Sequence, residues 1–141
     1  MSNPIAGEFM LNGGCLCGAI RYQTAGPVTS EAVCHCRTCR RSAGAPCVAW
    51  FTVPRDQFQL LSGTPSQFRS SNHAVRSFCP ACGTQLTFAD DTLPQEIDIS
   101  TASLDEPERV PPKRHIHTEN QLSWLKLADG LPAFRRSSSE G

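Results

Sequence analysis

Eight cysteines constrain this 141-residue chain more than any other feature, because seven of them fall into three short motifs. The eight are Cys15, Cys17, Cys34, Cys36, Cys39, Cys47, Cys79 and Cys82. In chain order they form a C-x-C motif, a C-x-C-x2-C motif, a single cysteine and a C-x2-C motif. Thiols at such spacings are typical of metal sites, although a short chain rich in cysteine can also be a disulfide framework.

The cellular compartment decides whether clustered cysteines bind metal or form disulfides. The first fourteen residues contain neither a basic region nor an apolar run of the kind that marks a secretory signal. We therefore expect a cytoplasmic protein, in which clustered thiols stay reduced and bind metal. The longest apolar run, "CVAWFTV", is far too short to cross a bilayer, so we expect no membrane association.

The outer two motifs together predict a four-sulfur site made of Cys15, Cys17, Cys79 and Cys82. On an extended backbone, residues two apart point to the same side, so a C-x-C strand can direct both sulfurs at one ion. A C-x2-C turn followed by a glycine permits the tight backbone of a metal knuckle. We interpret this set as a structural zinc site, with iron, an iron–sulfur cluster and disulfides as the alternatives.

The middle motif offers three sulfurs, from Cys34, Cys36 and Cys39, and so leaves one position of a tetrahedral ion open. Three protein ligands with a vacancy are typical of catalytic zinc. A closed second site is the alternative. Its fourth ligand would come from one of four side chains: Cys47, His73, His115 or His117. His115 and His117 are two apart in a predicted strand and are expected to share one face, which makes them credible ligands.

Short alternating segments predict the fold. Polar and apolar residues alternate in stretches such as 85–88 and 96–99, and the 10 glycines and 11 prolines supply many turns. We expect one all-β domain, sandwich-like or barrel-like, over residues 13–134, with an N-terminal arm at 1–12 and a flexible tail at 135–141. Helical signals are confined to one turn after Cys36, one near 54–58 and a short piece around 120–130.

Charge and the remaining polar residues add weaker signals. Thirteen basic and thirteen acidic residues give a formal net charge of zero, so no nucleic-acid partner is expected. His35 should point away from the metal and pack, and Cys47 is expected to be a small buried hydrophobe. Five arginines could pair with substrate carboxylates, although a surface or structural role is the default for each: Arg37, Arg40, Arg41, Arg69 and Arg76.

Four stretches carry a family resemblance. These are "GGCLCGAIRY", "CHCRTCRRSAGAP", "FCPACGTQLTF" and "RHIHTENQLSWLKLADGLPAF". Together they resemble the glutathione-dependent formaldehyde-activating enzyme (GFA) family, which also includes the centromere protein V type of protein. The resemblance implies a β-tent fold of antiparallel sheets. It also implies two zinc ions per chain: a structural one held by the outer four cysteines, and a second, open and more labile one facing the substrate at Cys34, Cys36 and Cys39.

The function that the resemblance implies is that of a zinc-dependent carbon–sulfur lyase. Such an enzyme condenses the thiol of glutathione with formaldehyde to give S-hydroxymethylglutathione, and its catalytic site here would be the three middle cysteines. A metal-bound thiol loses its proton at neutral pH, so we expect a small thiol and a small aldehyde as partners. The alternative is a non-catalytic, zinc-stapled module that binds a protein or nucleic acid. The two hypotheses differ in whether the second site is open.

Overall fold

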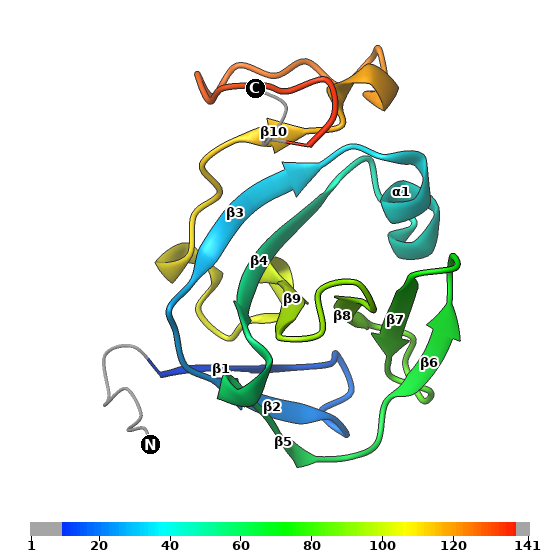
Figure 1. Ribbon diagram of the computed structural model, residues 1–141, viewed down its shortest axis with the longest axis vertical. Helices are drawn as coiled ribbons and strands as arrows, with labels where there is room; N and C mark the ends of the chain where they lie inside the picture. Colours follow the sequence, from blue (N-terminus) through cyan, green and yellow to red (C-terminus); the bar gives the residue numbers. More distant parts are fainter. Residues whose placement is uncertain (1–9, 138–141) are drawn as a thin grey trace.

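The computed structural model describes residues 10–137, which fold into two β-sheets and one short helix (Figure 1). The smaller sheet has the order β1-β2-β5, with β1 at Leu11–Gly14, β2 at Arg21–Thr24 and β5 at Phe58–Ser62. The larger sheet has the order β10-β3-β4-β9-β8-β7-β6. Its strands are β3 (Thr29–Cys34), β4 (Val48–Pro54), β6 (Ser66–Arg69), β7 (Ala74–Phe78), β8 (Gln85–Asp90), β9 (Glu96–Ser100) and β10 (His115–Ile116). The all-β prediction is confirmed.

Most pairs of neighbouring strands are antiparallel, and β10 pairs in parallel with β3. Residues 1–9 and 138–141 lie outside the described part of the chain, and with them most of the predicted arm and tail. β1 begins at Leu11, within the range predicted as an arm. Short 3₁₀ turns connect the strands: η2 (Arg55–Gln57), η3 (Thr101–Ser103), η4 (Pro107–Arg109) and η5 (Thr118–Asn120).

β4 shows how the sequence divides the large sheet into two buried faces. Alternate side chains of a strand point to opposite faces. Phe51 and Val53 are fully buried in the main core, where residues of both sheets meet. Trp50 points to the other face, where it packs in a second cluster with Cys34 and Cys39. The period-two pattern therefore places a cysteine-lined surface on the face of the sheet that is turned away from the main core.

The helix α1 (Arg37–Ala43) begins directly after Cys36, as the sequence predicts, although it is longer than one turn. Cys36 is its N-cap, and the sulfur of Cys36 accepts a hydrogen bond from the backbone amide of Cys39 at 3.3 Å. Gly44 ends the helix in the left-handed region (φ 63°), and its amide donates to the carbonyl of Arg40. In this way α1 holds Cys36 and Cys39 next to the end of β3.

Two expectations about the C-terminal part were wrong. Residues 121–130 form turns and irregular structure rather than a helix. An isolated helix of this length needs an apolar face packed on a core, and Trp124 instead leaves 66% of its surface exposed. His115 and His117 also do not share a strand face, because β10 ends at Ile116 and His117 adopts a φ of 57°. Across residues 10–137, every helix falls short of the length needed to span a membrane.

Candidate metal centres

Four cysteine sulfurs from distant parts of the chain meet between the two sheets. Cys15 and Cys17 follow β1, Cys79 and Cys82 follow β7, and all four sulfurs lie within 4.8 Å of one another. The Sγ atoms of Cys15 and Cys17 are 3.6 Å apart, and those of Cys17 and Cys79 are 3.8 Å apart. A tetrahedron of sulfurs about 2.3 Å from zinc has edges of about 3.8 Å, so this donor set fits the ion.

The local backbone explains why these sulfurs converge. The C-x-C motif lies in a turn rather than the predicted strand, and the amide of Gly18 donates to the carbonyl of Cys15 at 3.1 Å. A turn was needed because the chain reverses here from β1 into β2. In the C-x2-C motif the predicted role of glycine is confirmed: Gly83 has a φ of 83°, and its amide donates to the carbonyl of Cys79.

Hydrogen bonds from backbone amides or a hydroxyl favour the charged form of three of these sulfurs, those of Cys15, Cys79 and Cys82. The amide of Ile20 donates to the sulfur of Cys15 at 3.2 Å, and the amide of Ala81 donates to that of Cys79 at 3.3 Å. A hydrogen bond with the Thr84 hydroxyl lowers the pKa of the Cys82 thiol to about 5. All eight cysteines of the chain are free thiols, which leaves them available to a metal.

The three middle cysteines form a second cluster, whose sulfurs also lie within 4.8 Å of one another. Cys34 is the last residue of β3, and Cys36 and Cys39 are held by the first turn of α1. Cys34 and Cys39 are buried. The sulfurs affect one another: hydrogen bonds with Cys34 and Cys39 lower the pKa of the Cys36 thiol, and a hydrogen bond with Cys36 raises the pKa of the Cys34 thiol. Such a compact set of thiols fits one metal ion.

Within residues 10–137, no further cysteine, histidine or carboxylate joins this second cluster. Cys47 is only half-buried, less than predicted, and belongs to neither group of sulfurs. His73 is exposed beyond the end of β6, and His117 lines the cavity beside the cysteines without joining their cluster. Both ring nitrogens of His115 are occupied by other partners.

Those partners form a hydrogen-bonded chain that runs from the exposed Asp129 to the buried His35. The Nε2 atom of His115 lies 2.8 Å from a carboxylate oxygen of Asp129, and its Nδ1 lies 2.9 Å from Nε2 of His35. A carboxylate can only accept, so Nε2 of His115 donates to it, and His35 then donates to Nδ1 of His115. His35 is fully buried and its pKa is lowered by that burial. It points away from the sulfurs, as the sequence predicts, and joins the C-terminal segment to the cysteine motif.

A cavity of about 350 Å³ lies on the cysteine-bearing face of the large sheet. It is lined by all three middle cysteines and by residues of six strands, β3, β4, β7, β8, β9 and β10. Two lining residues were not predicted to lie beside the cysteines: Arg76, which the sequence offered only as a possible partner of substrate carboxylates, and Asp98, which it did not single out. Arg76 is 5% exposed and its Nη2 lies 3.7 Å from the sulfur of Cys39. Asp98 has its pKa raised to about 6 by burial. The sequence contains one indication that Arg76 is buried: it lies two positions after the apolar Ala74, on the same side of a predicted strand.

The five arginines singled out in the sequence separate in the structure. Arg76 enters the cysteine cavity, and Arg37 and Arg41 line the cavity next to it. Arg69 pairs with Asp91 at 2.8 Å. Arg40 instead lines a groove with Leu122 and Trp124.

Comparisons with known proteins place the chain in a family. The model of a family described as glutathione-dependent formaldehyde-activating enzyme matches residues 10–120. A Schizosaccharomyces pombe protein named "Uncharacterized lyase" is 35% identical over 77 residues, which cover 55% of this chain and only 56% of that relative. A Halomonas elongata protein named "Putative glutathione-dependent formaldehyde-activating enzyme" is 25% identical over 127 residues, covering 84% of this chain and 81% of its own length.

A solved structure shares the fold. The crystal structure of a Rhodobacter sphaeroides protein superimposes with a TM-score of 0.57 and covers 87% of this chain and 98% of its own. The two sequences are 20% identical, so this likeness concerns the fold alone.

Proposed function

The chain belongs to the glutathione-dependent formaldehyde-activating enzyme family, and from that premise we propose that it is a zinc-dependent carbon–sulfur lyase acting on a small thiol and a small aldehyde. Glutathione and formaldehyde are the first candidates, because the family name and the name of the Halomonas relative contain both. In the synthetic direction the thiol sulfur attacks the carbonyl carbon. A carbon–sulfur bond forms as the carbonyl π bond breaks, and the thiol proton ends on the former carbonyl oxygen.

One observation carries the proposal. Cys34, Cys36 and Cys39 gather at a cavity, and no fourth protein ligand joins them within residues 10–137. A module with two purely structural sites would need a fourth side chain at this position. Of the two histidines expected there, His115 is committed to His35 and Asp129, and His117 lines the cavity without joining the cluster. Three ligands beside a cavity suit a site that exchanges small molecules.

The two clusters have separate roles in this proposal. Cys15, Cys17, Cys79 and Cys82 would hold a structural zinc ion. A zinc ion held by Cys34, Cys36 and Cys39 would supply a positive charge that lowers the pKa of a substrate thiol at the vacant position.

The chain's own residues prepare the cavity for that chemistry. The guanidinium of Arg76 lies over the ring of Phe88, 5.0 Å from its centroid, and against the sulfur of Cys39. It places a fixed positive charge beside a cluster of thiolates, which reduces the cost of bringing one more sulfur anion there. The cavity walls confine two small reactants near each other, and such confinement can account for much of a rate enhancement.

The test combines metal analysis with turnover. Elemental analysis of the purified protein should give two zinc ions per chain, and X-ray absorption should show that the shell of one changes when glutathione is added. Nuclear magnetic resonance would follow formation of S-hydroxymethylglutathione against the uncatalysed background. The Cys36→Ser variant should retain one zinc and lose the rate above background.

An unchanged zinc shell, together with no rate above background, would contradict the proposal. The chain would then be a zinc-stapled binding module. As a control, Cys47→Ser removes a thiol that belongs to neither cluster, and it should keep both zinc ions and the rate.

A further inference from the structure

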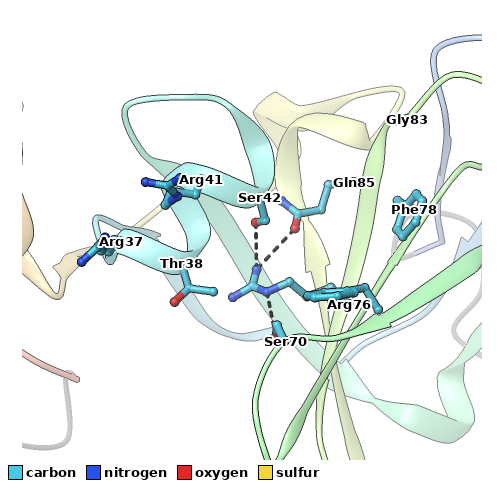
Figure 2. A pocket seen from close by; sticks show the side chains of 10 residues that line it. Arg37, Thr38, Arg41, Ser42, Ser70, Arg76, Phe78, Gly83 and Gln85 are labelled. Carbon is cyan, nitrogen blue, oxygen red and sulfur yellow. Dashed lines mark hydrogen bonds between the residues drawn. The ribbon is translucent and has the colours of Figure 1, made fainter.

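A second and larger cavity adjoins the cysteine cavity. It has a volume of about 680 Å³ and lies between α1 and the strands β6 and β7 (Figure 2). Its walls include Arg37 and Arg41 of α1, Arg76 and Phe78 of β7, and Phe68 of β6. Pockets of this size accept ligands the size of a short peptide.

The charge of this second cavity is one-sided. Among the described residues, three arginines line it and no acidic side chain does, although the whole chain has a formal net charge of zero. Arg37 and Arg41 are one helical turn apart, and like charges at that spacing destabilise a helix by a few tenths of a kcal/mol. Neither makes an ion pair within residues 10–137, whereas Arg69 and Arg21 pair with Asp91 and Asp105. Their positive charge is therefore free to meet an anionic ligand.

Arg76 connects this arginine cavity to the cysteine cavity. Its Nε and Nη1 atoms donate to neutral oxygens of Ser70, Ser42 and Gln85 at 3.2 to 3.3 Å, as Figure 2 shows. Its Nη2 faces the sulfur of Cys39. A buried guanidinium usually faces a carboxylate, and no carboxylate in the described part of the chain pairs with this one. Arg76, Thr38 and Ser70 line both cavities, so a ligand in one reaches the other.

We propose that the arginine cavity binds the carboxylate-bearing part of the thiol substrate, with Arg37 and Arg41 as the residues that determine its specificity. The substrate's thiol then lies in the adjoining cavity at the three cysteines. Guanidinium groups bind carboxylates through paired hydrogen bonds, and Phe68 and Phe78 offer apolar contact to the rest of such a molecule. The substrate class is a peptide-like thiol with carboxylates. This inference rests on the proposed function.

The experiment separates the carboxylates from the thiol. S-Methylglutathione keeps both carboxylates and has no free thiol, so its binding to the zinc-loaded protein, measured by calorimetry, reports on the arginine cavity. The double variant Arg37→Gln/Arg41→Gln should bind it at least about tenfold more weakly, because charge-assisted hydrogen bonds are lost. The control is Arg40→Gln, which removes one arginine charge from the same helix at a side chain outside this cavity; it should bind within about twofold of the unmodified protein. Binding to the unmodified protein should weaken as salt is raised.

A second probe distinguishes this inference from the proposed function. 2-Mercaptoethanol has a thiol and no carboxylate, and X-ray absorption reports whether it changes the zinc shell of the unmodified protein. Two results would overturn the inference alone, each together with a zinc shell that 2-mercaptoethanol changes. In one, the double variant binds S-methylglutathione as tightly as the unmodified protein does. In the other, the unmodified protein does not bind S-methylglutathione. Arginine-dependent binding of S-methylglutathione with a zinc shell that ignores both 2-mercaptoethanol and glutathione would support the carboxylate site and overturn the proposed function.

Discussion

Asp98 projects from β9 into the cavity that holds the three cysteines. Burial raises the pKa of its carboxyl group to about 6, and a hydrogen bond from the Thr52 hydroxyl at 2.6 Å works in the opposite direction. Glu96 and Asp90 add further negative charge nearby and raise the pKa as well. The folded chain therefore holds a proton on Asp98 more tightly than the unfolded chain does.

This difference predicts a pH-dependent stability. The contribution of Asp98 to the free energy of unfolding is fully present below its pKa in the unfolded chain, 3.8, and is lost as the pH rises through about 6. Urea unfolding of the unmodified protein and of Asp98→Asn, each zinc-loaded, should show the difference in free energy between them falling by about 2 kcal/mol from pH 4.5 to 7.5. Both carry the same cysteines, so the pH dependence of zinc binding cancels. Parallel curves would show that the carboxyl group titrates normally.

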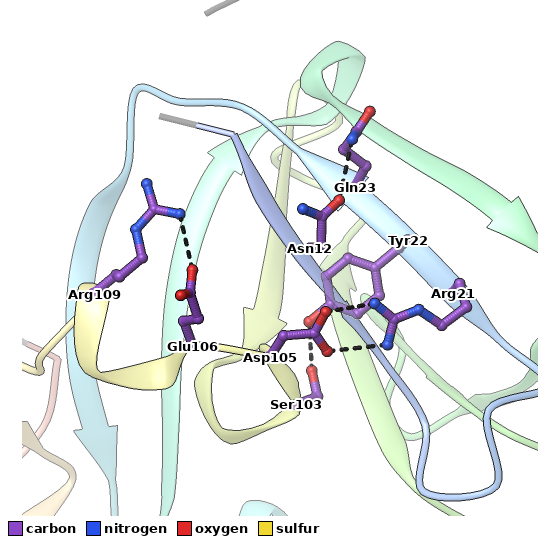
Figure 3. A network of polar contacts seen from close by, with 8 residues as sticks. All are labelled: Asn12, Arg21, Tyr22, Gln23, Ser103, Asp105, Glu106 and Arg109. Carbon is purple, nitrogen blue, oxygen red and sulfur yellow. Dashed lines mark hydrogen bonds and ion pairs between the residues drawn. The ribbon is translucent and has the colours of Figure 1, made fainter. Parts of the chain in front are cut away.

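At the scale of elements, the hairpin of β1 and β2 is fastened to the turn η3 and the residues after it (Figure 3). The Tyr22 hydroxyl lies 2.6 Å from that of Ser103, and Arg21 donates to Asp105 at 3.0 Å. Gly13 lies between the Tyr22 side chain and η3, and it pairs with Tyr22 across the hairpin. A Cβ atom at Gly13 would lie 2.6 Å from the carbonyl oxygen of Ser103, closer than real contacts allow. Only glycine lets the hairpin approach the turn this closely.

The Gly13→Ala variant should therefore lower the free energy of unfolding by about 2 kcal/mol, because the hairpin must move away from η3. Chemical denaturation of the zinc-loaded protein measures this change. Asn12→Ala is the matched control, since Asn12 is the exposed neighbour on the same strand, and it should change stability by no more than about 0.5 kcal/mol. Equal effects of the two substitutions would mean that the hairpin adjusts without cost.

Elements with period-two alternation are the ones that the sequence predicts well, because alternation follows directly from strand geometry. The segments at 85–90 and 96–100 are examples, and both are strands of the large sheet. The C-terminal segment was predicted less well. Its apolar residues suggest a helix at 120–130, but its path is set by backbone pairing such as that of Phe134 with His115, which no local pattern encodes.

The candidate site also has one part that the sequence predicts and another that it does not. Grouping the cysteines by spacing predicts both clusters, since each motif places its sulfurs by local geometry. Arg76 and Asp98 could not be assigned to the second site from the sequence. Both reach it only because β7, β8 and β9 lie side by side and turn the same face toward the cysteines. Contacts between strands distant in sequence depend on sheet order, which alternation alone leaves open.

At the scale of the whole molecule, the four-cysteine site joins the β1–β2 hairpin to the β7–β8 hairpin. Its cysteines Cys17 and Cys79 are 62 positions apart, whereas the second cluster spans six positions of one motif. Closing a long loop restricts the unfolded chain more than closing a short one. The first site should therefore contribute to the stability of the entire fold, and the second mainly to its own surroundings.

Cys79→Ser should accordingly lower the free energy of unfolding by about 4 kcal/mol or more, because the metal link between the sheets is lost. Cys36→Ser should lose the second zinc and cost about 1 kcal/mol. Circular dichroism during thermal denaturation, with zinc content measured on the same samples, checks both. Equal destabilisation by the two variants would refute this division between the clusters.

The unequal spans of the two clusters also set an order of events during protein synthesis. A chain leaves the ribosome from its N-terminus, and domains assemble as their parts emerge. Cys34, Cys36 and Cys39 emerge together and can capture an ion at once, while Cys15 and Cys17 must wait for Cys82. Under the proposed function, the exchangeable site would thus be the first to meet metal, and the structural site could close only when more than half of the chain has been made.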